Sequence, residues 1–101
     1  MKKIINGKKY DTGTARLVGE RASNLENNLT YVLESLYKKR TGEFFIAGEG
    51  GPMTSYRTYI DANSWRGGSK ITPLTEAEAR GWAENNLTAE QYGAVFGPVA
   101  E

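Results

Sequence analysis

Residues 31–47 restrict the fold of this chain more than any other segment. Residues 31–39 alternate strand-forming side chains between two faces, Arg40-Thr41-Gly42 has the composition of a tight turn, and residues 43–47 form an apolar return segment. This pattern predicts an antiparallel hairpin. Because the return segment is apolar on both faces, we expect the hairpin to lie at the centre of a sheet.

A second hairpin is predicted near the N-terminus. Asn6-Gly7 is a strong two-residue turn signal, because both residues tolerate positive φ, and it separates short strands expected at residues 3–5 and 8–10. Residues 15–22 are compatible with a strand or a short helix. A glycine and a β-branched valine in that segment favour the strand.

Glycine-rich segments are expected to separate the remaining strands. Residues 48–52 and 63–69 are predicted as flexible loops, the second of which carries a tryptophan. Residues 70–72 are interpreted as a short edge strand. Pro73 is expected to end that strand, because proline cannot donate to a sheet ladder.

Two capping boxes predict two C-terminal helices. In each box a threonine hydroxyl accepts a backbone N–H three residues later, and the side chain at that later position reaches back to the cap. The first helix is expected to run to about Asn86, with Trp82 as its core anchor, and the second to end near Phe96. The paired residues are Thr75 with Glu78 and Thr88 with Gln91.

The order of these elements indicates the fold class. Strands come first and helices last, which is typical of an α+β domain with its helices on one face or end of an antiparallel sheet. A length of 101 residues suits one domain. We therefore expect a single α+β domain over residues 1–101, with an antiparallel sheet built from hairpins and followed by two helices.

The composition argues against catalysis. The chain has no cysteine and no histidine, so it lacks disulfides, thiolate chemistry, the commonest general base and the commonest metal ligand. We expect no enzymatic activity and no cofactor or metal. A hydrolase built on carboxylates alone is the remaining alternative. Its candidate residues are Glu34, Glu43, Glu49 and Asp61.

The N-terminal residues bear on location. Lys2-Lys3 is followed by only two apolar residues, whereas a secretion signal needs roughly seven or more. No segment approaches the roughly 18 apolar residues of a membrane span. The expected location is the cytoplasm of a bacterial host cell, without membrane contact.

Charges are unevenly distributed along the chain. Residues 1–40 hold nine Lys/Arg and four Asp/Glu, whereas residues 41–101 hold four and eight. This asymmetry favours a charged interaction surface, with mixing of the charges by folding as the alternative.

The cations of the two hairpins are candidate nucleic-acid-binding residues. If the hairpins lie together, these cations and the rings of Tyr10 and Tyr37 would suit phosphates and stacked bases. The alternative is that the lysines keep exposed strand edges from pairing. The candidates are Lys8, Lys9, Lys38, Lys39 and Arg40.

Two other sets of residues are candidates for binding a protein. Acidic side chains of the C-terminal third can mimic nucleic-acid phosphates toward a basic protein groove. Trp65 and Arg66 are residue types that dominate binding energy at interfaces, although Trp65 can alternatively cover the core. The acidic candidates are Glu76, Glu78, Glu84 and Glu90.

Several segments together resemble a group of small proteins carried on bacterial mobile elements. The opening MKKIINGKKYDT at residues 1–12 is the most distinctive of them. The other segments that carry the resemblance are residues 35–45, 48–52, 63–71 and 73–75.

Some proteins with this opening are anti-CRISPR proteins, which protect phages and plasmids. The resemblance therefore implies an inhibitor that binds a Cas effector, or its guide RNA complex, and blocks guide or target nucleic-acid binding. It assigns no functional residue. The alternative function is a small nucleic-acid-binding module or autoregulator with no Cas target.

Overall fold

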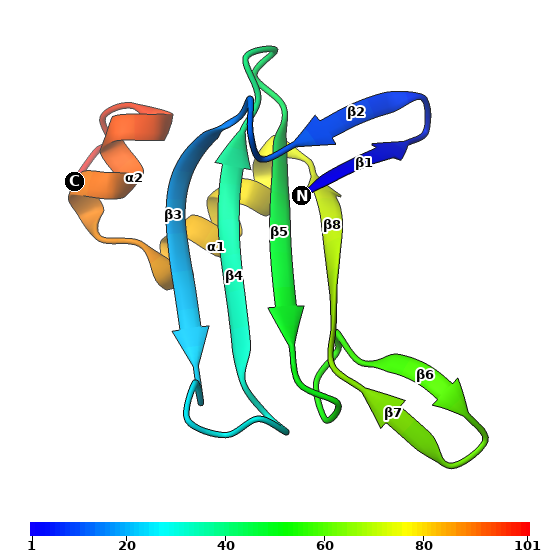
Figure 1. Cartoon of the computed structure of the whole chain (residues 1–101). Coiled ribbons are helices and arrows are strands. Elements are labelled where there is room, and N and C mark those ends of the chain that lie inside the picture. Colours follow the sequence, from blue (N-terminus) through cyan, green and yellow to red (C-terminus); the bar gives the residue numbers. More distant parts are fainter.

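The computed structural model describes residues 1–101 and has an α+β fold (Figure 1). A four-stranded antiparallel sheet in the order β3-β4-β5-β8 forms the body, and two separate two-stranded hairpins flank it. The strands are β1 (Lys2–Ile5), β2 (Lys8–Asp11), β3 (Arg16–Ser23), β4 (Val32–Lys38), β5 (Phe44–Gly50), β6 (Thr58–Asp61), β7 (Ser64–Arg66) and β8 (Gly68–Leu74), and the helices are α1 (Glu76–Asn86) and α2 (Ala89–Phe96).

The predicted central hairpin is confirmed, because β4 and β5 occupy the middle of the sheet. Alternation along these strands sends Leu36, Phe44 and Ile46 to the face that α1 covers, where they bury against Ala79. The half-buried ring of Trp82 packs on this cluster, as expected for the anchor of α1. This layer of apolar side chains fixes the helices to the sheet.

The hairpin β1–β2 packs on the opposite face of the sheet, in front of β5 and β8 in Figure 1. Asn6 and Gly7 form its turn with φ of 51° and 77°, as the Asn-Gly signal predicts. Tyr10 packs with Phe45 and Ile71 in a second, smaller cluster. The sheet is therefore covered by helices on one side and partly by a hairpin on the other.

Both predicted capping boxes are present. The hydroxyl of Thr75 accepts the N–H of Glu78 at 3.1 Å, and the Glu78 carboxylate accepts the N–H of Thr75 at 2.9 Å. Thr88 and Gln91 repeat this arrangement at the start of α2. The helices end at Asn86 and Phe96, as expected from the sequence.

The two glycine-rich loops were predicted wrongly in part, since only Gly51 and Pro52 of the first lie outside the strands. Residues 48–50 belong to β5, and residues 63–69 contain β7 and the start of β8. Gly48 lies in the sheet because the ring of Tyr56 crosses directly over it, where any Cβ atom would overlap the tyrosine. From the sequence alone, a strand glycine that makes room for a neighbouring ring cannot be distinguished from a glycine in a loop.

The end of β8 also differs from the prediction. The strand continues through Pro73 to Leu74, and Phe45 is the cross-strand partner of Pro73. Proline is tolerated here because β8 is an edge strand, with no further strand on its outer side.

The strands β6 and β7 form a hairpin that projects beyond the end of the sheet, here called the arm (Figure 1). Its base is closely packed backbone. A Cβ atom at Gly67 would lie 2.7 Å from the carbonyl oxygen of Gly50, and one at Gly68 would lie 2.6 Å from that of Tyr56. Where the arm joins the body, these two positions therefore have room only for glycine.

Candidate binding surfaces

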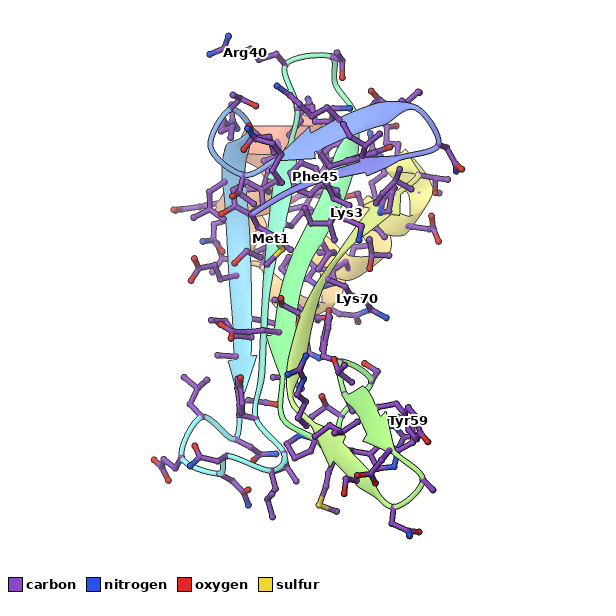
Figure 2. The ribbon with its side chains drawn as sticks, turned by 45° about the vertical axis from the view of Figure 1, so that its right-hand side comes forward. Met1, Lys3, Arg40, Phe45, Tyr59 and Lys70 are labelled. Carbon is purple, nitrogen blue, oxygen red and sulfur yellow. The ribbon has the colours of Figure 1, made fainter.

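The molecule is elongated, with principal extents of 49 × 32 × 21 Å. Figure 2 shows Arg40 at one end of the long axis and Tyr59 on the arm toward the other end. These two ends have different chemistry. The basic end is defined here by Lys8, Lys9, Arg16, Lys38, Lys39 and Arg40, and the apolar end by Leu25, Leu29, Met53, Tyr59, Ile60 and Trp65.

At the basic end, the two hairpins meet at Glu43. Its carboxylate lies 2.9 Å from the ammonium of Lys8 on β2 and 3.1 Å from that of Lys39. Thr41 also donates to it at 3.0 Å. Hydrogen bonds from Lys8, Lys39 and Thr41 lower the pKa of Glu43 from 4.5 to about 2. Glu43 therefore stays ionised and neutralises part of the charge of two candidate cations.

The aromatic rings of the basic end pack against the sheet and leave little surface for nucleic-acid bases, because Tyr10 is buried and Tyr37 is half-buried. Tyr10 is 6% exposed and packs edge-on against Phe45, with the ammonium of Lys39 4.3 Å from its ring centre. The half-buried ring of Tyr37 stacks on Phe45 at 5.3 Å. These rings fill the space between the sheet and β1–β2, because a small domain needs its large side chains for the core.

Besides Lys9, three cations of the basic end form no ion pair, namely Arg16, Lys38 and Arg40. Together with Lys39, Thr14 and Ala15 they line a surface hollow of about 410 Å³. Arg16 was not among the residues chosen from the sequence. Only the register of β3 against β4, which pairs Arg16 with Lys38, brings it there.

The arm carries an ordered cluster of exposed side chains. Tyr59 and Trp65 are cross-strand partners whose rings meet edge-on at 5.4 Å, and they are 57% and 46% exposed. The guanidinium of Arg57 lies 4.4 Å from the centre of the Trp65 ring. Trp65 is therefore not a lid on the core, and the exposed Arg66 follows it on β7. The expected flexible loop is a structured hairpin.

Loops from the body extend this apolar end. The backbone N–H of Met53 donates to the carbonyl oxygen of Leu29 at 2.9 Å, which joins the loop after β5 to the loop before β4. Met53 is 68% exposed, and Leu29 is also exposed. Large exposed apolar side chains thus gather at the end of the molecule from which the arm projects.

The acidic candidates on the helices are only partly free. Glu76 pairs with Arg80 at 3.4 Å, and Glu78 is held in the capping box of α1. Glu84 and Glu90 form no ion pair, and Glu84 borders a groove of about 940 Å³ between α1 and α2. Local contacts therefore reduce the number of acids that can face a basic partner.

The acids considered for catalysis do not converge, and no group of three acidic side chains is placed to hold a metal ion. Glu34 accepts hydrogen bonds from Arg21 at 2.5 Å and from the Tyr56 hydroxyl. Glu43 contacts Lys8 and Lys39, whereas Glu49 accepts from Tyr31. Each of these three carboxylates therefore accepts hydrogen bonds from a different set of side chains.

The network around Glu34 is structural and was not foreseen from the sequence. Its carboxylate is 17% exposed, and the indole N–H of Trp82 lies 3.5 Å from it. Burial alone would raise the pKa of Glu34, but hydrogen bonds from Tyr56 and Arg21 outweigh burial and lower it. Burial and Glu34 together raise the pKa of the Tyr56 hydroxyl.

Comparisons with protein-family models, with curated proteins and with solved structures find no match to this chain. Neither helix is long and apolar enough to cross a membrane.

Proposed function

We propose that this protein is a non-enzymatic inhibitor of a CRISPR–Cas effector, to which it binds through its arm. The observation that carries the proposal is the exposed cluster of Tyr59 and Trp65 on a hairpin that projects from the body, with Arg57 directly before that hairpin. Tryptophan, tyrosine and arginine are the residue types that contribute most at protein interfaces. The resemblance in the sequence supplies the class of partner.

The arm is suited to a partner surface with an apolar pocket rimmed by carboxylates. Trp65 and Tyr59 present rings to bury, and Arg57 and Arg66 present two guanidinium groups beside them. The rings already contact each other, so less side-chain entropy is lost when they are bound. Such a contact would cover part of the effector and block guide or target nucleic-acid binding.

A pull-down with purified Cas effectors, with and without guide RNA and nuclease, tests this proposal. We expect an effector to remain bound after nuclease treatment. Trp65→Ala should weaken this binding about 30-fold, the effect of losing about 2 kcal/mol at a central contact. Ile4→Ala is the matched control, because Ile4 is 63% exposed on the other two-stranded hairpin.

Equal binding of the Trp65→Ala variant and the wild type would contradict the role of the arm. Loss of every partner after nuclease would favour the alternative, a nucleic-acid-binding module without a Cas target. Guide RNA incubated with the protein alone should remain intact, and cleavage that follows the protein through purification would contradict a non-enzymatic mode.

A further inference from the structure

The basic end contains an arrangement of like charges that the fold itself does not balance. Arg16 on β3 and Lys38 on β4 are direct cross-strand partners. Like charges directly opposite each other destabilise a sheet, and neither residue has a carboxylate partner. Arg40 adds a third unpaired cation in the following turn, on the rim of the same hollow.

A phosphate is the anion that this arrangement suits best. Guanidinium groups bind phosphate oxygens through paired hydrogen bonds, and an ammonium adds a point charge. The hydroxyl-bearing Thr14 and the small Ala15 complete the lining, so no acidic group faces the hollow. Three cations spread over a strand start, a strand end and a turn can contact successive phosphates of one chain.

The nearby Glu43 sets a limit on this site. Its carboxylate lies 2.9 Å from the ammonium of Lys8 and 3.1 Å from that of Lys39, so these two cations are already ion-paired. The rings of Tyr10 and Tyr37 are packed against Phe45, and Tyr10 is buried and Tyr37 half-buried, so they offer little surface to bases. The available contacts are therefore to the backbone of a nucleic acid and not to its bases.

We propose that Arg16, Lys38 and Arg40 form a binding site for the phosphodiester backbone of nucleic acid, and that Glu43 limits its affinity by neutralising Lys8 and Lys39. The site contacts phosphates regardless of base sequence. Three phosphate contacts predict a slope of log affinity against log salt of about −2 on single strands and about −2.7 on duplex DNA. This inference does not depend on a Cas effector, so its failure would leave the proposed role of the arm intact.

Fluorescence anisotropy with labelled 20-nucleotide RNA, single-stranded DNA and duplex DNA, each in two unrelated sequences, tests the site between 25 and 200 mM salt. We expect binding that ignores base sequence and weakens with salt at about the stated slopes. Arg16→Gln and Arg40→Gln should each weaken binding and reduce the steepness of the slope by about 0.7–0.9. Lys3→Gln is the matched control, because it removes one charge from the N-terminal hairpin outside the hollow.

Glu43→Gln gives the opposite sign to the loss of a cation. It should tighten binding and steepen the salt dependence, because Lys8 and Lys39 lose their internal counterion. Glu90→Gln on α2 makes the same change in net charge away from the hollow, so it is the control for a general effect of net charge. Thermal unfolding of each variant identifies loss of fold, and Arg40, in an exposed turn, provides a variant that keeps it. Equal weakening by Lys3→Gln and Arg16→Gln would overturn the assignment. So would equally tight binding of poly-glutamate, which would indicate an acidic protein as the ligand.

Discussion

At the scale of single residues, Glu34 is a charged group that links several elements of the fold. It lies on the helix-covered face of β4 and is 17% exposed. Arg21, Tyr56 and Trp82 approach it from β3, from the loop before the arm and from α1. A carboxylate in this position is stable only while its donors are present, because an unpaired buried charge is costly.

We predict that Glu34→Gln lowers the free energy of unfolding at pH 7 by about 2 kcal/mol, the usual cost of losing hydrogen bonds to a charged group. The pKa of Glu34 is lower in the folded protein than its ordinary value of 4.5. Its charge therefore stabilises the fold above pH 4.5, and this contribution is lost as the pH falls through the lowered pKa.

Urea unfolding of both proteins between pH 7 and pH 3 measures this effect. The difference between wild type and variant should be largest at neutral pH and should narrow below pH 4.5. A difference that stays constant over this range would show that the charge of Glu34 does not contribute.

The residues that sequence reasoning identified are those whose role is local. A capping box is complete within four residues, so Thr75 and Glu78 could be assigned without any tertiary structure. Glu34 and Arg16 acquire their roles from partners on other strands or helices. Their sequence context shows only a charge in a strand pattern, which is equally typical of a solvent-exposed position.

At the scale of elements, the two helices depend on their caps to different degrees. The first helix buries Ala79 and Ala83, whereas α2 has no fully buried residue and contacts the core through the partly buried Val95 and Phe96, of which Phe96 stacks on Phe44 at 5.3 Å. A helix of 8 residues is too short to be stable alone. The second helix therefore relies on its capping box and a few partly buried contacts.

We predict that Thr75→Ala lowers the free energy of unfolding by about 1 kcal/mol, because one N-cap hydrogen bond is lost. Thr75→Ser is the control, since serine caps as well as threonine, and chemical denaturation measures both variants. An unchanged midpoint for Thr75→Ala would contradict the cap.

We predict that Thr88→Ala acts locally. The amides of α2 should exchange with solvent faster, while those of β4 and β5 keep their protection, because α2 can open without the sheet. Hydrogen exchange measures both sets of amides. Uniform loss of protection over the whole chain would show that α2 and the sheet unfold together.

Elements with a repeating pattern were predictable, and those defined by close backbone contact were not. Alternation predicted β4, an apolar return segment after a turn predicted β5, and cap signals predicted both helices. The arm was missed because its strands are short and lie among glycines and polar residues, which favour a loop when read alone.

At the scale of the whole molecule, the body and the arm are separate structural units. The aromatic contacts of Tyr59 and Trp65 are with each other and with Arg57, and the four-stranded sheet is complete without them. Thr58 and Arg66 are cross-strand partners, so a two-residue Asn-Gly turn can connect them directly.

We predict that replacing residues 59–65 with Asn-Gly shifts the thermal midpoint by less than about 4 °C, the shift that 1 kcal/mol produces in a domain of this size. The same variant should lose binding to the effector while keeping salt-dependent binding to nucleic acid. Loss of cooperative unfolding would show that the arm belongs to the body.

The closely packed base of the arm has a consequence for how this chain can change its target. Substitution at Gly67 or Gly68 forces backbone apart, whereas substitution at the outward positions of β6 and β7 alters only the tip that meets a partner. A change of binding partner therefore requires substitutions only at a few exposed positions of the arm, while the sheet and the helices stay the same. A library of variants randomised at Tyr59, Ile60 and Trp65 should contain proteins that bind new partners. Its members should remain folded, so no separate selection for folding should be needed.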